Sequence, residues 1–275
     1  MRSVPAGGLP RLSIFQYWDS EEIPDYIAAL LESVADSNPE LEHRVFSEST
    51  AEELIAAHFG PRELACFRAC ALPAMQADYF RYCALLALGG VYVDADNRCV
   101  SSLWPLIEDD RSAHMFHGDR PLDLDGVELC GIQNRLLIFK QPRHPLMEIV
   151  LEAATLQIER RVGGSAASPA VGPNPGRMVW AVTGPAILTG LWFASQQQSL
   201  DAFLDRFAAT RFDWLARTLA EAAGDSARLA HAFDRVGVSR LSECEAIRGA
   251  GIELPYKASD RHWFNSRSAI YRSPA

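Results

Sequence analysis

Residues 73–96 read Pro-Ala-Met-Gln-Ala-Asp-Tyr-Phe-Arg-Tyr-Cys-Ala-Leu-Leu-Ala-Leu-Gly-Gly-Val-Tyr-Val-Asp-Ala-Asp, and this stretch decides the fold. Pro73 suits the first turn of a helix and Gly89 suits its end, so the spacing predicts one helix between them. Val-Tyr-Val after the glycine pair is a β-rich run that predicts a short strand. Two carboxylates, Asp94 and Asp96, follow at the end of this strand.

Asp94 and Asp96 are expected to form a cation site. Positions two apart in an extended strand point the same way, so both carboxylates face a common point. Two like charges beside a buried strand repel each other, and each costs several kcal/mol if it is desolvated without a partner. A divalent cation resolves this conflict, and hard oxygen ligands suit Mg²⁺ or Mn²⁺.

Asp78 and Arg81 are three positions apart on the predicted helix and therefore share a face. A solvated ion pair on a helix surface is one interpretation, and it is worth only a few tenths of a kcal/mol. A role in a functional site is the other interpretation of this pair.

Strands and helices alternate upstream of residue 73. We expect a strand at 12–18, a helix from Pro24 to about Ser37 and a strand at 41–46. Thr50 and Glu53 predict a capping box for a helix through His58, which Gly60-Pro61 then ends. This order predicts an α/β fold with a parallel sheet and with ligands at the carboxyl ends of the strands.

The chain downstream of residue 96 is expected to complete one domain, residues 1–275. Further strands are predicted at 114–118 and 136–139, and the Gly/Pro/Ser/Ala-rich segment 163–177 indicates a mobile loop or lid. A β-like run precedes Thr183-Gly184-Pro185. From Leu200 the pattern is helical, and residues 200, 203, 204 and 207 form an amphipathic stripe that predicts core packing. We expect a helical insertion at about 195–245.

Composition restricts the class of protein. A net charge of −9 argues against nonspecific binding to a phosphate backbone, so nucleic acid is not an expected partner. The six cysteines are scattered through apolar or helical stretches, which is typical of reduced, buried thiols. The first ten residues lack the apolar core of a signal peptide, and no run reaches the length of a membrane span. We expect a cytoplasmic protein without a transmembrane segment, acting either in solution or peripherally at a membrane.

Two strings of residues together resemble a known family. Ala77-Asp78-x-x-Arg81-Tyr82, followed by Leu88-Gly89-Gly90-Val91-Tyr92-Val93-Asp94-x-Asp96, resembles the DxD glycosyltransferases with a sugar-binding region. These are enzymes of the capsular-polysaccharide and mannosyltransferase type, related to the catalytic domains of glucosylating toxins. The resemblance covers about residues 12–185 with gaps, plus a weak match near the C-terminus.

The resemblance implies a GT-A-type nucleotide-binding sheet flanked by helices and a role in polysaccharide biosynthesis. It implies metal-dependent transfer of a hexose from a UDP- or GDP-hexose, with retention of configuration. The acceptor, whether glycan, lipid-linked or protein, is not identified by these residues.

Site roles also follow from the resemblance. Asp94 and Asp96 would hold Mn²⁺ or Mg²⁺ with His262, and the catalytic set would be Asp94, Asp96 and Arg81. The donor site would comprise Gln16, Trp18, Asp78, Arg81, Tyr82, Gly90, Asn134, Thr183, Gly184 and Trp263, with residues 255–275 closing over the donor. Phe15 departs from the family, because many relatives have histidine there. A core role for Trp18 and an ordinary surface or core role for His262 are the alternatives.

Two other functions fit parts of the pattern. A haloacid-dehalogenase-like phosphatase also places Asp-x-Asp after an apolar strand, but usually near the start of the chain and without the preceding Asp78 and Arg81. A non-catalytic protein that binds nucleotide-sugars would keep the fold and the carboxylates without turnover, because a fold alone does not prove activity.

Overall fold

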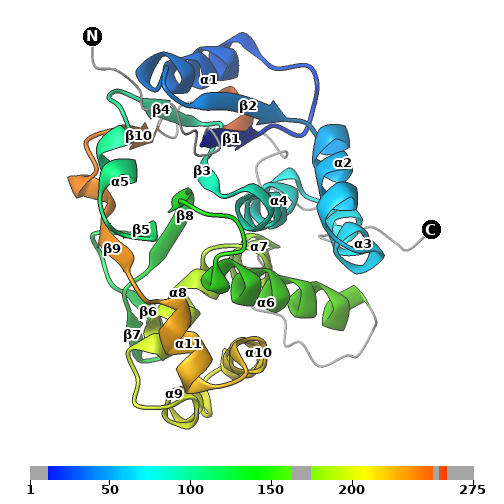
Figure 1. Cartoon of the computed structure of the whole chain (residues 1–275). Helices are drawn as coiled ribbons and strands as arrows, with labels where there is room; N and C mark the ends of the chain where they lie inside the picture. The colour runs from blue at the N-terminus through cyan, green and yellow to red at the C-terminus, as the bar shows by residue number, and fades with distance from the viewer. Residues whose placement is uncertain (1–11, 163–174, 250–253, 259–275) are drawn as a thin grey trace.

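A six-stranded mixed sheet runs through the protein in the order β2-β1-β3-β8-β5-β9 (Figure 1). The computed structural model describes residues 12–162, 175–249 and 254–258. The strands are β1 (Ser13–Tyr17), β2 (Glu42–Phe46), β3 (Gly90–Val93), β5 (Ala113–His117), β8 (Ile132–Phe139) and β9 (Val236–Arg240). β1 is parallel to β2 and β3, and β5 is parallel to β9. The predicted α/β class is confirmed.

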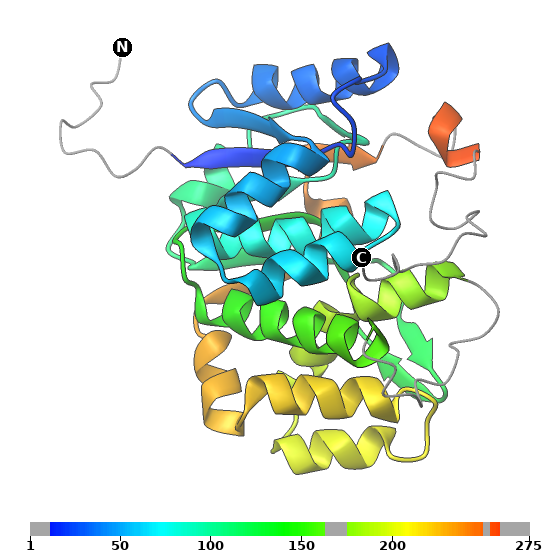
Figure 2. The same cartoon turned by 90° about the vertical axis from the view of Figure 1, so that its right-hand side faces the viewer.

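Side chains of the central strands alternate between two apolar layers, as the period of an extended strand requires. Phe15 and Tyr92 belong to the larger core, and their neighbours Ile14 and Val91 belong to a smaller core on the opposite face. The larger core is covered by α2 (Glu48–His58), α3 (Pro61–Ala69), α4 (Pro73–Leu88) and α6 (Pro145–Val162), seen in front in Figure 2. α1 (Asp25–Ser37) and α5 (Trp104–Glu108) contribute to the smaller core.

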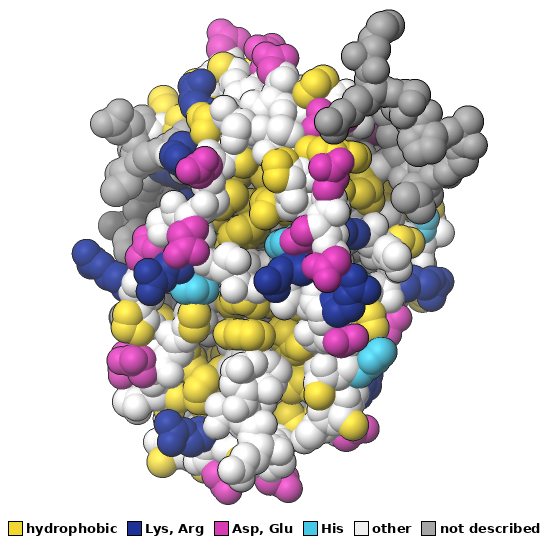
Figure 3. Space-filling model, turned by 60° about the vertical axis from the view of Figure 1, so that its left-hand side comes forward, with side chains coloured by type: hydrophobic (Ala, Val, Ile, Leu, Met, Phe, Trp, Pro, Cys, Tyr) yellow, Lys and Arg dark blue, Asp and Glu magenta, His cyan; other side chains and the backbone are white. Residues whose placement is uncertain are grey.

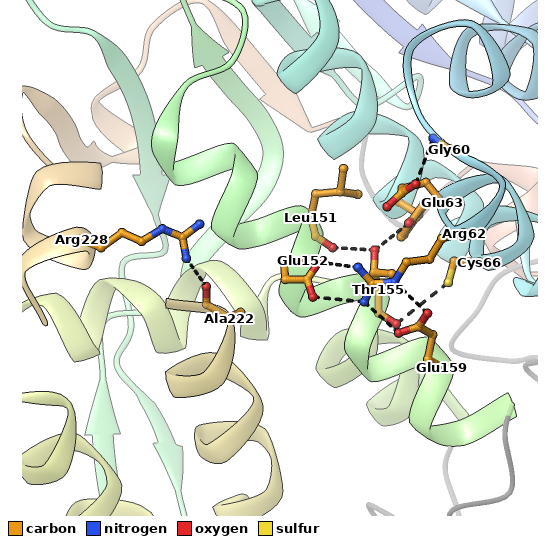
Figure 4. Close-up of polar contacts among 11 residues, drawn as sticks. Gly60, Arg62, Glu63, Cys66, Leu151, Glu152, Thr155, Glu159, Ala222 and Arg228 are labelled. Carbon is orange, nitrogen blue, oxygen red and sulfur yellow. Dashed lines mark hydrogen bonds and ion pairs between the residues drawn. The ribbon is translucent and has the colours of Figure 1, made fainter. Parts of the chain in front are cut away.

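A charged clamp joins α3 to α6 (Figure 4). Arg62 Nη1 lies 2.7 Å from Glu152 Oε2, and its Nε lies 2.8 Å from Glu159 Oε1. All three side chains are more than a third exposed, so the clamp contributes at most about 1 kcal/mol. The α3–α6 contact therefore depends mainly on apolar packing beneath it.

The last third of the described chain is mostly helical and packs against α6 and β8. Its helices are α7 (Pro175–Val182), α8 (Ala186–Ser195), α9 (Leu200–Phe207), α10 (Asp213–Ala223) and α11 (Ser226–Ala232). The predicted stripe on α9 is confirmed as core, because Phe203 and Phe207 are buried with ring centroids 5.3 Å apart. β9 then returns to the edge of the main sheet, so region 195–245 combines three helices with one sheet strand. None of the described helices has both the length and the apolar character to cross a bilayer.

Two small antiparallel pairs complete the fold. β6 (Leu122–Leu124) and β7 (Val127–Leu129) form a hairpin, and β10 (Ile247–Gly249) pairs with β4 (Asn97–Cys99). The β4–β10 pair follows directly after Asp96, and the 3₁₀ turns η1 (Leu241–Glu243) and η2 (Pro255–Ala258) lie on either side of β10 in the chain. Residues far apart in sequence are thereby brought to the end of β3.

Charged side chains of both signs are interspersed on the face that Figure 3 shows. The pairing of opposite charges is explicit at Asp109, whose Oδ1 lies 2.6 Å from Lys140 Nζ and 3.0 Å from His114 Nε2. His114 thus belongs to a structural network, in line with its lack of ligand spacing in the sequence.

Several local predictions are wrong. The capping residue of α2 is Ser47, whose side chain accepts a hydrogen bond from the Thr50 N–H at 3.4 Å, so the helix begins before the predicted box. Gly60-Pro61 also begins α3, which was not predicted; proline is tolerated at the first helical position.

The sheet and the region before Thr183 also differ from expectation. β8 is antiparallel to both of its neighbours, β3 and β5, so the sheet is mixed rather than parallel throughout. The apolar run before Thr183 is the end of α7 and not a strand, because short apolar runs fit a buried helix as well as a strand. Most of the predicted loop, residues 163–174, lies outside the described residues.

Candidate active site

Six of the predicted site residues line one cavity of about 280 Å³. They are Trp18, Asp78, Arg81, Asp94, Asp96 and Asn134. The cavity lies where β1 and β3 end, beside α4, β8 and the turn between α7 and α8. This is the edge of the sheet at which ligands of α/β proteins are expected.

Arg81 connects α4 to both neighbouring strands. Its Nη2 lies 2.8 Å from Asp78 Oδ1 and its Nη1 lies 3.1 Å from Asp94 Oδ1. Nη1 also donates a hydrogen bond to the Asn134 carbonyl at 2.6 Å, and the guanidinium stands 4.4 Å from the centroid of the Tyr92 ring. Arg81 is 3% exposed and Asp78 is 6% exposed, so this is a buried ion pair and not a solvated one. α4 presents apolar residues around most of its surface, which places both charges inside.

Asp78 is held by residues from two segments outside its own helix. Asn134 Nδ2 on β8 donates to its Oδ1 at 2.8 Å, and the Thr183 hydroxyl after α7 donates to its Oδ2 at 3.2 Å. Burial raises the pKa of the Asp78 carboxyl to about 6, against the opposing attraction of Arg81. A carboxylate has about four acceptor sites, so Asp78 can still accept a hydroxyl hydrogen from a ligand in the cavity.

Asp94 lies immediately after β3 and is fixed through its backbone. Its N–H donates to the Arg135 carbonyl on β8 at 2.9 Å, and Gln16 Nε2 donates to its carbonyl oxygen at 3.3 Å. Burial raises the pKa of the Asp94 carboxyl above its ordinary value, and the positive charges of Arg81 and Arg135 oppose that rise. The first carboxylate of the pair therefore stands at a fixed position beside two guanidinium groups.

Asp96 is contacted from the C-terminal part of the chain. The Tyr256 hydroxyl donates to Asp96 Oδ2 at 2.7 Å, and Lys257 Nζ lies 2.7 Å from the same oxygen. Burial, together with the nearby charge of Asp96, raises the pKa of the Tyr256 hydroxyl, so this group stays a hydrogen-bond donor at neutral pH. A cation supplied by the protein therefore already stands beside the second carboxylate.

Trp18 lies between the cavity and a small apolar cluster. It is 8% exposed, and it packs with Ile27, Leu30 and Ala95. Its ring meets the Tyr256 ring edge to face, with centroids 5.6 Å apart and an interplanar angle of 88°. Two aromatic rings thus form one end of the cavity.

Some predicted donor residues support the cavity without being among its lining residues. Gln16 is buried, and its Oε1 lies 2.7 Å from His43 Nε2 while its amide holds the Asp94 carbonyl. The Tyr82 hydroxyl donates to the Thr183 carbonyl at 2.8 Å and faces the Gly184 carbonyl at 3.3 Å. These contacts position Asp94 and Thr183, which in turn face or support the cavity.

Gly90 is required by the backbone. Its φ is +110°, and a Cβ atom at this position would lie 2.5 Å from the Ser13 carbonyl oxygen and 3.0 Å from the Phe15 ring. Glycine adopts this conformation without steric cost. Gly90 therefore lets β3 approach β1 closely and sets where Asp94 emerges.

Two predicted site residues lie outside the described part of the chain, and three described residues at the site were not predicted from the sequence. His262 and Trp263 fall among residues 259–275, which the structure does not describe. The sequence reading did not single out Tyr256, Lys257 or Arg135, all of which reach Asp94 or Asp96 from distant positions. The only sequence signal for the first two was their place at the start of the segment expected to close over the donor.

The carboxylate pair fits a cation that a ligand helps to hold. Within the described ranges, no three His, Cys, Asp or Glu side chains converge as a closed metal site would require. Mg²⁺ is usually bound by one or two carboxylates together with water and substrate phosphates, so two aspartates are a sufficient protein contribution. Asp94 and Asp96 would be those ligands.

The sequence of this region matches a known family. Residues 24–113 match the family described as glycosyltransferase sugar-binding region containing DXD motif. Over this segment the chain is similar to the DXD-motif glycosyltransferases. The predicted resemblance is therefore confirmed, and the matched segment runs from the start of α1 to β5 and includes Asp78, Arg81, Asp94 and Asp96.

Several curated proteins are similar to this chain. The initiation-specific alpha-1,6-mannosyltransferase of Candida albicans is 25% identical over 229 residues, covering 74% of this chain and 58% of that protein. Mannosyl phosphorylinositol ceramide synthase SUR1 of Saccharomyces cerevisiae is 30% identical over 137 residues, covering 50% and 32%. Inositol phosphoceramide mannosyltransferase 2 of Schizosaccharomyces pombe is 25% identical over 144 residues, covering 52% and 38%. The chain thus spans 32% to 58% of the length of these relatives.

Among solved structures, the PaToxG glycosyltransferase is similar at 14% sequence identity and a TM-score of 0.43, covering 81% of this chain and 84% of that chain.

Proposed function

We propose that this protein is a metal-dependent glycosyltransferase that moves a hexose from a UDP- or GDP-hexose to a glycan, lipid-linked or protein acceptor, with retention of configuration. The observation that carries the proposal is that Asp94 and Asp96 both line the cavity into which the Asp78–Arg81 pair also projects. The three relatives described above are named for mannosyl transfer, so mannose is the first hexose to test.

Each side chain has a role that its chemistry supports. Asp94 and Asp96 would hold Mn²⁺ or Mg²⁺, which neutralises the charge that develops on a departing nucleoside diphosphate. Asp78, held by Asn134 and Thr183, accepts hydrogen bonds from sugar hydroxyls. Arg81 fixes Asp78 relative to Asp94, so the sugar and the leaving group are oriented by one buried guanidinium.

The base of the donor is assigned to the aromatic end of the cavity. Trp18 offers a π-face, and Tyr256 buttresses it edge to face. Stacking of a base on an aromatic side chain stabilises binding by about 1–3 kcal/mol. His262 and Trp263 complete the proposal as a metal ligand and a donor contact in the segment that follows Tyr256.

We propose one catalytic domain of the GT-A type over residues 1–275, because the larger core includes residues from α2 through α11. We propose a cytoplasmic or membrane-peripheral enzyme of polysaccharide biosynthesis, and the burial of Cys66, Cys83, Cys99 and Cys244 fits reduced thiols in such a compartment.

The proposal is tested with isosteric variants of the carboxylate pair. Purified Asp94→Asn and Asp96→Asn proteins are given a panel of UDP- and GDP-hexoses with Mn²⁺ and no acceptor, and released nucleoside diphosphate is measured. Each variant should lose about 10²–10³-fold in rate, because charge stabilisation of the leaving group is removed. Asp110→Asn is the matched control, since Asp110 is exposed and is not among the residues that line the cavity. Near-normal turnover by either site variant would refute the assignment.

One observation favours a second candidate, a nucleotide-sugar-binding protein without turnover. Lys257 Nζ stands 2.7 Å from Asp96, so the protein supplies part of the charge that a metal would otherwise supply. Donor binding by the wild type with no hydrolysis or transfer across the panel would favour this function. The match of residues 24–113 to a glycosyltransferase family favours these two functions over the phosphatase interpretation.

A further inference from the structure

A second arginine, Arg135, lines the same cavity. It lies on β8, where the antiparallel register pairs Val93 with Leu136, and the Asp94 N–H donates to the Arg135 carbonyl at 2.9 Å. Continuing that register by one step places Arg135 directly across from Asp94. Residues directly opposite on antiparallel strands present their side chains on the same face. The Arg135 guanidinium therefore shares the face of the first carboxylate.

The Arg135 guanidinium is not neutralised by the protein as Arg81 is. Within the described ranges, no carboxylate oxygen lies within 4.0 Å of it, and its Nε is buried without a hydrogen-bond partner. The neighbouring carboxylates are engaged elsewhere, Asp94 by Arg81 and Asp96 by Lys257. Buried donors are almost always paired in folded proteins, so this one calls for a partner that binds in the cavity.

Gly249 on β10 makes room for this guanidinium. A Cβ atom on Gly249 would lie 2.9 Å from Arg135 Nη1, closer than real contacts allow. Gly249 pairs with Asn97, so it lies next to the end of the Asp94–Asp96 segment. β10 thus contributes a bare backbone against which the guanidinium rests beside the carboxylate pair.

The charge pattern identifies the ligand. A guanidinium that shares the face of Asp94 repels the divalent cation that Asp94 and Asp96 would hold, unless an anion lies between the two positive groups. A planar guanidinium also fits phosphate oxygens with two parallel hydrogen bonds. We propose that Arg135 binds the diphosphate of the nucleotide-sugar donor, beside the Asp94 carboxylate. The inference rests on the proposed function.

The test separates binding of the phosphates from binding of the nucleoside. Dissociation constants for UDP, GDP, uridine and guanosine are measured by calorimetry with Mn²⁺ present. Arg135→Met should weaken binding of the preferred diphosphate by about 10- to 100-fold, because charged hydrogen bonds are lost, and should leave the matching nucleoside unchanged. Arg135→Lys keeps the charge without the fork and should fall between.

Two further variants control for charge and for folding. Gly249→Ala keeps Arg135 but forces its guanidinium to move, so it should also weaken diphosphate binding selectively. Arg98→Met removes the same charge from the exposed outer side of β4 and should bind like the wild type. Thermal unfolding of each variant verifies that it is folded, and Arg135→Lys and Gly249→Ala keep the test decisive if Arg135→Met does not fold.

The binding measurements distinguish a failure of the proposed function from a failure of the Arg135 assignment. A wild type that binds neither UDP nor GDP overturns the proposed function and this inference together. A wild type that binds a diphosphate, with Arg135→Met binding it equally well, overturns the inference alone. If Arg135→Met weakens binding of the diphosphate and of the nucleoside equally, Arg135 has a structural role, and the inference is overturned. If diphosphate binding is unchanged while sugar transfer is impaired, Arg135 acts on the acceptor, and the inference is again overturned.

Discussion

Replacing Arg81 by Met should be among the most destabilising changes at the site. Arg81 contacts Asp78 at 2.8 Å, Asp94 at 3.1 Å and the Asn134 carbonyl at 2.6 Å, and it is 3% exposed. Removing one partner of a buried ion pair costs about 3–5 kcal/mol, because the other charge is left uncompensated. The charged hydrogen bond to Asn134, worth about 1.5–3 kcal/mol, is part of this loss and does not add in full. We expect about 4 kcal/mol at pH 7.5.

The loss should depend on pH in a defined direction. Burial already raises the pKa of Asp78 to about 6 with Arg81 present, and Arg81 opposes that rise. Without Arg81 the folded carboxyl holds its proton more strongly, so the variant loses more stability as the pH rises. At pH 5 Asp78 is mostly protonated in both proteins, and the loss should shrink to about 2 kcal/mol.

The assay is equilibrium urea unfolding at pH 5 and pH 7.5, followed by tryptophan fluorescence. Asp78→Asn in the Arg81→Met background should recover part of the loss, since it removes the uncompensated charge. Arg217→Met is the matched control: its ion pair with Asp213 is exposed, and its loss should stay below about 0.5 kcal/mol. A loss below about 1 kcal/mol for Arg81→Met, equal losses at both pH values, or strict additivity with Asp78→Asn would refute the reasoning.

Three further predictions concern neighbouring positions. Because burial raises the pKa of Asp78 from 3.8 to about 6, the folded protein binds this proton more tightly than the unfolded chain, so the group lowers stability as the pH rises between these values. The effect reaches up to about 3 kcal/mol. Asp78→Asn lacks this titrating group, so the unfolding free energy of the wild type minus that of the variant should fall by this amount between pH 4 and pH 7. Gly90→Ala should lower the unfolding free energy in urea by about 3 kcal/mol, through backbone strain and a clash with the Ser13 carbonyl. Gly126→Ala is also at positive φ but has open space around it, so it should cost about 1 kcal/mol. Equal costs for the two variants would contradict the clash. Trp18→Ala should raise the dissociation constant of the preferred nucleotide-sugar by about 10-fold in calorimetry, and an unchanged constant would leave Trp18 a core residue.

Local sequence was sufficient for the centre of the site. Pro73 and Gly89 bound α4, the apolar, aromatic-rich run at 12–18 and the β-rich run Val-Tyr-Val placed β1 and β3, and the two carboxylates follow β3 as expected. These features depend on neighbours within a few residues, so propensity and periodicity report them directly. The shared face of Asp78 and Arg81 follows from helix geometry in the same way.

Contacts between distant segments were beyond that reasoning. No local pattern shows that β8 would enter the sheet antiparallel between β3 and β5, and that insertion alone sets Arg135 across from Asp94. Tyr256 and Lys257 both contact Asp96, and the Tyr256 hydroxyl donates its hydrogen bond to a residue 160 positions earlier in the chain. The burial of the Asp78–Arg81 pair likewise depends on β8 and the end of α7 closing over α4. Residue identity encodes which groups can carry the chemistry, whereas strand order and packing decide which of them meet, because long-range pairing is governed by burial of whole faces and not by any local preference.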